Sequence, residues 1–132
     1  MSQANVDIVQ RMYDAWRRQE FPGPAGLLDD EIEYVNPAGA VEPGTRRGVD
    51  EFADAIRRVH ESWEFWEMEL ETLTAVGDQV AVVVRYRSRG RGSGVEVEGR
   101  ESALWTVRGG KIVRMEWFHG AGDALEAAGL AQ

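Results

Sequence analysis

The spacing of apolar residues in the first part of the chain is typical of two amphipathic helices. One helix is predicted to end near Trp16, and its apolar face consists of Val6, Val9, Met12, Tyr13 and Trp16. The other begins near Asp50, whose carboxylate suits the positive end of a helix dipole. Its apolar face consists of Phe52, Ile56, Val59 and Trp63.

Between these helices, Ile32, Tyr34 and Asn36 alternate with the side chains of the opposite face, which predicts a short strand ending before Pro37. Proline and glycine recur over 37–48, so this segment is predicted to be a loop.

From Trp66 onward the hydrophobic period changes to two, which indicates strands. The predicted strands cover 66–73, 80–89, 95–107 and 112–119. Four strands in succession form an antiparallel meander, and one or two helical turns can follow at 123–128. The order of elements predicts a single α+β domain over residues 1–132, with its helices packed on one face of a curved sheet.

The last two predicted strands contain one carboxylate, Glu101, on a face that is otherwise apolar or small. A three-residue loop over 108–110 pairs Val107 with Lys111. The resulting cross-strand pairs are Ala103 with Met115, Glu101 with Trp117, and Gly99 with His119. Diagonal neighbours on one face lie within about 7–8 Å, so Glu101 and His119 are expected to interact.

A two-residue turn at Gly109–Gly110 is the alternative. It pairs Arg108 with Lys111 and moves Arg114, Glu116 and Phe118 onto the face of Glu101. A slip of one residue exchanges the two faces of a strand, so burial decides the register. Burial of Val113, Met115 and Trp117 favours the three-residue loop.

In the preceding hairpin, a four-residue loop over 91–94 places Arg89 opposite Glu96 and Arg87 opposite Glu98. Opposite charges across a strand pair stabilise a hairpin by about 0.2–1 kcal/mol per pair. The arginines of 85–91 are therefore interpreted as a solvated ladder and not as an RNA-binding segment. The same register places Val82, Val84 and Tyr86 on the face of Glu101.

Composition narrows the functional classes. The chain has no cysteine, which excludes disulfides and thiolate zinc sites and fits a cytoplasmic location. Its formal charge of −8 argues against a nucleic-acid partner. The longest aliphatic run, 80–84, is too short for a bilayer, so no membrane partner is expected. The two histidines, His60 and His119, lie in different predicted elements, and neither a metal site nor a cofactor motif is expected.

The candidate catalytic residues are Glu101 and His119. A carboxylate in an apolar pocket has a raised pKa and can act as a general acid or base near neutral pH. His119 can exchange a proton or orient Glu101. The alternative for Glu101 is an ion pair with Arg85, Arg87 or Arg100, and the alternative for His119 is a strand-end side chain bonded to backbone.

Several polar and aromatic residues are candidates for binding a ligand. Asn36, with Tyr34 or Tyr13, can orient a ligand oxygen; the alternative for Asn36 is an Asn–Pro turn. The chain has five tryptophans, which can wall a cavity or fill the core. The predicted binding residues are Tyr13, Trp16, Tyr34, Asn36, Trp63, Trp66, Trp105, Met115 and Trp117.

Several stretches resemble the SnoaL-like branch of the nuclear transport factor 2-like superfamily. They are the helix ending near Trp16, the strand end at 33–37, Arg47–Gly48, and the region from Gly94 to Leu130. The resemblance implies a cone-shaped, cystatin-like fold with a hydrophobic pocket between helices and sheet, and a homodimer. Relatives include ketosteroid isomerase, limonene epoxide hydrolase and polyketide cyclases, so the fold alone does not settle the function.

By this resemblance, Asn36 stands at the position of the isomerase's aspartate base, Met12 near that of its tyrosine, and Ala103 at that of its neutral aspartic acid. Gly120 stands where a cyclase carries an aspartate. None of these residues supplies the group that the relatives use.

Two hypotheses follow. In the first, the chain binds a small hydrophobic metabolite and carries out acid-base catalysis of the isomerase, cyclase or hydrolase type without a cofactor. In the second, it is a non-catalytic domain that binds a ligand or a partner protein. An enclosed cavity containing Glu101 favours the first, and an open sheet face packed on another chain favours the second.

Overall fold

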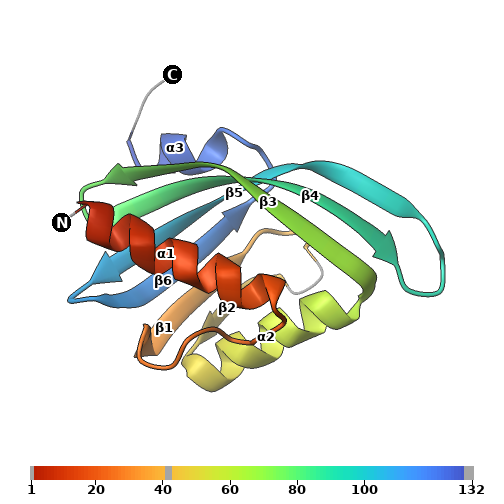
Figure 1. The fold of residues 1–132 in the computed structure, drawn as a ribbon, viewed down its shortest axis with the longest axis horizontal. Helices are drawn as coiled ribbons and strands as arrows, with labels where there is room; N and C mark the ends of the chain where they lie inside the picture. Colours follow the sequence, from red (N-terminus) through yellow and green to blue (C-terminus); the bar gives the residue numbers. More distant parts are fainter. Residues whose placement is uncertain (1, 41–42, 130–132) are drawn as a thin grey trace.

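The computed structural model describes residues 2–40 and 43–129. These described residues form three helices and one six-stranded sheet, and Figure 1 shows that the sheet is curved. The elements are α1 (Ser2–Arg17), β1 (Leu28–Asn36), β2 (Gly44–Arg47), α2 (Val49–Glu61), β3 (Trp63–Val76), β4 (Gln79–Gly90), β5 (Glu96–Arg108), β6 (Lys111–Phe118) and α3 (Asp123–Ala127). The α+β class, the two long helices and the four-strand meander are confirmed. Two positions considered from the sequence, the centre of the 37–48 loop and the end of the family resemblance at 130, lie outside the described residues.

The sheet has the strand order β2-β1-β6-β5-β4-β3. Strands β1 and β6 are parallel, and all other neighbours are antiparallel. Helices α1 and α2 cover one face of the sheet, and α3 packs on the other (Figure 1). None of the helices in the described ranges is both long and apolar enough to span a lipid bilayer.

Strand alternation separates the interior into two layers. The odd-numbered face of β5, including Ala103 and Trp105, joins the main core with Val9 and Met12 of α1 and Phe52 of α2. A smaller cluster on the opposite face consists of Ala81, Leu104 and Ala124, so it lies between the sheet and α3. The face toward α1 and α2 is therefore the one that can enclose a pocket.

The predicted loop at 37–48 contains strand β2. Its residues pair with β1, for example Thr45 with Val35, and Arg47 forms an ion pair with Glu33 at 2.8 Å. The sequence of β2 has no apolar alternation because the strand is an exposed edge held by backbone pairing. The second helix also ends earlier than predicted, and Trp63 is the first residue of β3.

The turn between β5 and β6 is the two-residue alternative. Arg108 pairs with Lys111, and Gly109 and Gly110 have φ values of 58° and 77°. A type I′ turn needs positive φ at both central residues, which glycine adopts without strain.

The two-residue turn alone would place Arg114 and Glu116 on the face of Glu101, and a β-bulge in β6 prevents this. Val107 pairs with Ile112, but Thr106 pairs with Arg114, so Val113 is the extra residue on β6. The observed pairs are Trp105 with Met115 and Ala103 with Trp117. Ala103 was predicted to pair with Met115, and its observed partner Trp117 lies two residues further along β6, although Met115 and Trp117 do share the face of Ala103. The pairing ends at Ser102 with Phe118, so the pairs predicted for Glu101 and Gly99 are not formed among the described residues. Burial explains the bulge, because Ile112 lies in the main core, where the three-residue loop predicted Val113.

The register of β4 and β5 is confirmed. Arg87 lies opposite Glu98, and Arg89 lies opposite Glu96, with a 2.7 Å ion pair in the second case. Arg87 instead forms its ion pair with Glu67 on β3, at 2.9 Å. The arginines therefore belong to a charged ladder on the outer face of the hairpin.

Two buried serines in the sheet differ in their hydrogen bonding. The Ser102 hydroxyl donates to the Gly120 carbonyl at 2.6 Å and accepts from the Ala124 amide at 3.1 Å, which ties β5 to α3. The Ser88 hydroxyl is equally buried, but it has no hydrogen-bond partner among the described residues.

This contrast predicts different costs for removing each hydroxyl. Ser102→Ala leaves the buried Ala124 amide unpaired and should lower the free energy of unfolding by about 1–3 kcal/mol, although the Gly120 carbonyl keeps its hydrogen bond from the Asp123 amide at 3.3 Å. Ser88→Ala removes a buried hydroxyl that lacks a partner, so it should leave that free energy unchanged or raise it, by at most about 1–3 kcal/mol. Urea unfolding of both variants measures the difference; equal losses would show that Ser88 makes a stabilising bond.

Candidate active site

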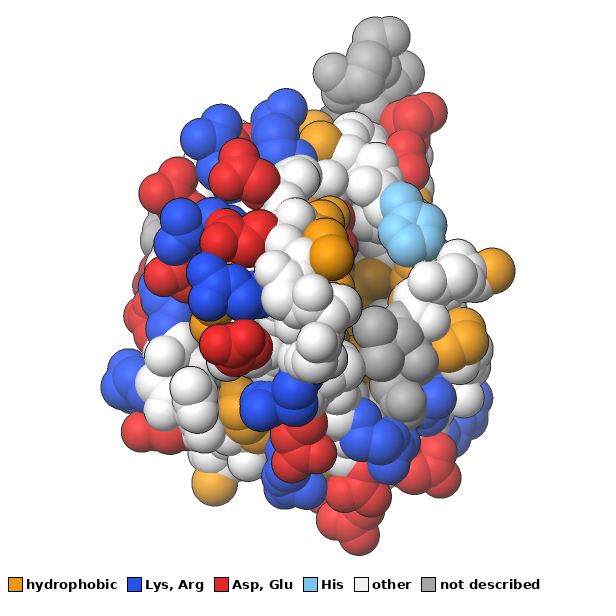
Figure 2. All heavy atoms as spheres, turned by 90° about the vertical axis from the view of Figure 1, so that its right-hand side faces the viewer, with side chains coloured by type: hydrophobic (Ala, Val, Ile, Leu, Met, Phe, Trp, Pro, Cys, Tyr) orange, Lys and Arg blue, Asp and Glu red, His pale blue; other side chains and the backbone are white. Residues whose placement is uncertain are grey.

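A cavity of about 260 Å³ lies between the helices and the inner face of the sheet. Figure 2 views the side of the molecule on which a hollow opens, with hydrophobic side chains visible inside it. Eight of the residues predicted from the sequence line this cavity: Trp16, Tyr34, Asn36, Trp63, Trp66, Glu101, Trp117 and His119.

Strand β5 carries Glu101 into the cavity wall. Its neighbour on β4 is Val84, and both lie on the face that packs toward the helices. Among the described residues, no hydrogen bond or ion pair reaches the Glu101 carboxylate. Burial raises the pKa of Glu101 to about 7, and the positive charge that His119 can carry opposes part of that rise.

The proposed ion pair between Glu101 and an arginine is not formed. Arg85 and Arg100 both contact Glu71, at 3.2 and 2.8 Å. Since Arg87 is paired with Glu67, all three candidate partners are engaged on the outer face of the sheet. The Glu101 side chain therefore remains in the cavity without a compensating cation in direct contact.

His119 lies just beyond the end of β6, and its side chain is exposed at the edge of the cavity. Its Nε2 lies 3.1 Å from the Ala38 carbonyl oxygen. A carbonyl only accepts, so Nε2 carries the proton of this bond and Nδ1 is the acceptor in the neutral ring. The structure brings Glu101 and His119 to one cavity, with no direct hydrogen bond between them.

Tyr34 forms the polar part of the wall on β1. Asn36 and Trp117 hydrogen-bond to its phenol oxygen, and burial outweighs their effect to raise the pKa of Tyr34 to about 12. The phenol therefore keeps its proton at neutral pH.

Three predicted binding residues lie behind the wall instead of lining it. Tyr13, Trp105 and Met115 are fully buried in the main core. The Trp105 indole donates to the Tyr13 hydroxyl at 3.1 Å, and both rings pack edge-on or tilted against Trp16. These residues fix the position of Trp16, which does line the cavity.

Sequence reasoning missed three polar residues of the lining, His60, Tyr86 and Ser88. His60 Nδ1 donates to the Ile56 carbonyl at 2.9 Å, burial lowers the pKa of its ring, and Nε2 is left as an acceptor. The sequence contained a signal for each of these residues. His60 stands four residues after Ile56 on the apolar helix face, and Ser88 continues the alternation that includes Tyr86.

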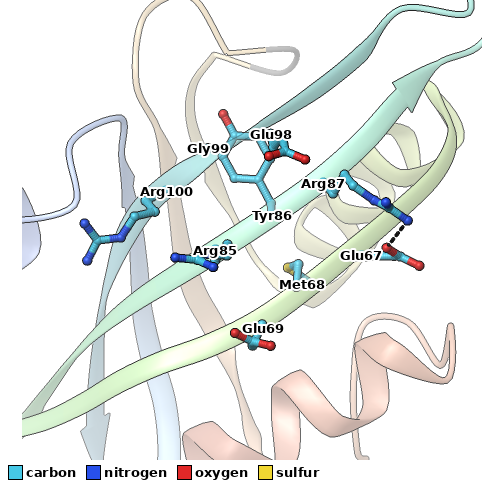
Figure 3. A pocket seen from close by; sticks show the side chains of 9 residues that line it. All are labelled: Glu67, Met68, Glu69, Arg85, Tyr86, Arg87, Glu98, Gly99 and Arg100. Carbon is cyan, nitrogen blue, oxygen red and sulfur yellow. Dashed lines mark ion pairs between the residues drawn. The ribbon is translucent and has the colours of Figure 1, made fainter.

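A second, more open hollow of about 620 Å³ runs along β3, β4 and β5. Figure 3 shows that charged side chains dominate it, with Arg87 paired to Glu67. Charge pairs in contact with water contribute little binding energy. The smaller cavity with Glu101 is therefore the candidate active site.

The buried carboxyl predicts a pH-dependent stability. Its pKa rises from 4.5 in the unfolded chain to about 7 in the folded one. Between these values the folded chain holds a proton that the unfolded chain releases, so stability falls as pH rises through this window. Glu101→Gln removes this loss and should be more stable than the wild type by about 1–3 kcal/mol at pH 8, with little difference attributable to ionisation below pH 4.5.

Urea unfolding at several pH values tests this prediction. Glu98→Gln is the matched control, because Glu98 lies on the same strand but is exposed. A Glu101→Gln advantage that does not grow between pH 4.5 and 8 would show that the Glu101 carboxyl ionises normally.

Comparisons with known proteins agree with this architecture. Uncharacterized protein Rv0034 of Mycobacterium tuberculosis is 26% identical over 125 residues, covering 94% of this chain and 95% of that protein. A crystal structure of an NTF2-like protein from Burkholderia thailandensis is 32% identical, covers 97% of both chains and has a TM-score of 0.80. TerC, co-crystallised with polyporic acid, is 20% identical with a TM-score of 0.78 and covers 96% of this chain and 98% of its own. Residues 9–115 match the SnoaL-like domain, and the chain therefore belongs to the SnoaL-like family.

Proposed function

We propose that this chain binds a small hydrophobic molecule in the cavity and catalyses proton transfer on it, with Glu101 as the acid-base group. The observation that carries the proposal is the Glu101 carboxyl, placed in an apolar cavity with no direct partner among the described residues and a pKa of about 7. A structural ion pair, the main competing explanation for an inward carboxylate, is absent from these residues.

The pKa of Glu101 suits the role of an acid-base group. A group with a pKa near the working pH is present in both protonation states, and it is a stronger base than an ordinary carboxylate. As base, Glu101 takes a proton from a substrate carbon or, in a hydrolase, from the attacking water; in the protonated form, it gives a proton to another atom of the substrate. Isomerase, cyclase and hydrolase chemistry all contain such steps.

Neighbouring residues supply complementary roles. The Tyr34 O–H can donate to a substrate oxygen on which charge develops, and Asn36 and Trp117 orient that phenol. His119 stands at the exposed edge of the cavity, where its Nδ1 can exchange protons with water. Aromatic walls including Trp16 and Trp66 exclude water from the reacting atoms.

The family supports this proposal at the level of the pocket. TerC, which shares the fold, was co-crystallised with polyporic acid, and we infer that the present cavity also accepts an organic molecule. Asn36 is a carboxamide that cannot abstract a proton, and Ala103 has no ionisable group. Catalysis in this chain therefore depends on Glu101, at a position different from those used by the isomerase it resembles.

The proposal includes a homodimer in the cytoplasm, as the family resemblance and the lack of cysteine suggest. It includes no metal and no cofactor. Binding without catalysis is the competing function, and the following experiment separates the two.

Kemp elimination of 5-nitrobenzisoxazole tests the base directly. A base removes the ring C–H proton, the N–O bond breaks, and a coloured cyanophenolate forms. The wild type should accelerate this reaction, with half-maximal rate near pH 7. Glu101→Gln should be slower by about a hundredfold or more.

Glu98→Gln, exposed on the same strand, is the control and should keep the wild-type rate. Equal rates for wild type and Glu101→Gln would remove Glu101 from the mechanism. Saturable binding of the probe without acceleration would favour the non-catalytic function.

A further inference from the structure

One end of the cavity contains hydrogen-bond donors without acceptors. The indole Nε1 atoms of Trp63 and Trp66 and the hydroxyl of Ser88 are buried, and none has a hydrogen-bond partner among the described residues. All three residues line the cavity. The proton transfer proposed above uses none of these three donor groups.

These donors come from two adjacent strands. Trp66 on β3 lies directly opposite Ser88 on β4, and Trp63 lies opposite Gly90 at the end of the same strand pair. Side chains directly opposite on one face are about 5 Å apart at Cβ. Trp66 and Ser88 are therefore neighbouring side chains on the cavity wall, close enough for one ligand to contact both.

An unsatisfied buried donor is unfavourable by about 1–3 kcal/mol, and native proteins contain few of them. Trp63 packs edge-on against Trp66, with ring centroids 5.8 Å apart, and such a contact satisfies an N–H only weakly. Ser88 lacks even this contact, and 1% of its surface is exposed. Three such groups in one cavity wall are best explained by an acceptor that a ligand brings.

The chemistry of the lining selects the kind of acceptor. Among the described residues, no lysine or arginine lines the cavity, while Glu101 is present. A carboxylate or phosphate would be buried there without a countercharge. A neutral oxygen, such as a ketone carbonyl, can accept two hydrogen bonds without that penalty.

The position of the donors sets the shape of the ligand. On β4, Ser88 is four residues from Val84, the neighbour of Glu101. Four residues of extended strand span about 13 Å. A substrate that reaches both places is therefore elongated, on the scale of two fused rings with a substituent.

We propose that Trp66 and Ser88, assisted by Trp63, form a carbonyl anchor at the end of the cavity away from Glu101. The substrate is then an elongated aromatic or alicyclic ketone whose oxygen binds the anchor while its reacting carbon lies beside Glu101. The identity of the ligand as a substrate rests on the proposed function, whereas the hydrogen bonding of the anchor is inferred from the unpaired donors. The donors are buried, so binding includes a turn of the partly exposed indole rings.

Two probes of matched shape test the anchor, 2-acetylnaphthalene and 2-ethylnaphthalene, which differ in the carbonyl oxygen. The ketone should bind the full chain about fivefold more tightly, as one net hydrogen bond implies. In ¹⁵N-labelled protein, the indole N–H proton of Trp66 should move downfield with the ketone and not with the hydrocarbon. Trp→Phe variants assign the five indole signals.

Ser88→Ala should reduce the ketone preference to about twofold or less, whereas Ser93→Ala, in the exposed hairpin loop, should leave it unchanged. Equal affinity for the two probes, or a ketone-specific shift confined to Trp117, would overturn the anchor. Binding of the hydrocarbon with no ketone preference removes the anchor alone and keeps the cavity of the proposed function. Binding of neither probe overturns both.

Discussion

The alternation of side chains between the two faces of the curved sheet is the constraint on which the rest of the structure depends. The parity of a strand means which alternate residues face the helices. Each strand can present only alternate residues to α1 and α2, and the bulge at Val113 lets β6 combine a tight glycine turn with the parity that buries Met115. Without that bulge, Arg114 and Glu116 would face the core. The same parity on β5 brings Glu101 inward beside Ala103 and Trp105, so the fold places one carboxyl in an apolar cavity as a consequence of register.

The cavity combines features that oppose stability. Glu101 is half-buried without a cation in contact, and the Ser88 hydroxyl and two indole N–H groups are buried without acceptors among the described residues. A chain selected only for stability would pair or replace such groups, since each is unfavourable when buried alone. They gather in one cavity, while the ion pairs lie on the outer face, as those of Arg85 and Arg87 do. This division separates the face of the sheet that we propose binds a ligand from the face that carries the ion pairs.

Much of the fold could be predicted from the sequence because its signals are local. Helical spacing predicted α1, and opposite charges fixed the register of β4 and β5. Strand β2 could not be predicted because its Gly-Thr-Arg-Arg sequence has no apolar alternation and is held at an edge by backbone pairing and the Arg47–Glu33 ion pair. The bulge at Val113 depends on how the core fills. Periodicity also gives the face of a residue and not its depth, which is why Trp105 and Trp117 seemed equivalent and only Trp117 lines the cavity.

The central claim is that Glu101 is a carboxyl poised to exchange a proton near neutral pH. A ¹³C NMR titration of its side-chain carboxyl carbon, assigned by comparison with Glu101→Gln, measures this property without a substrate. The account predicts a titration midpoint of about 7. A midpoint near 4.5, the ordinary value for glutamate, would contradict it, because the carboxylate would then be solvated or paired and an ordinary weak base.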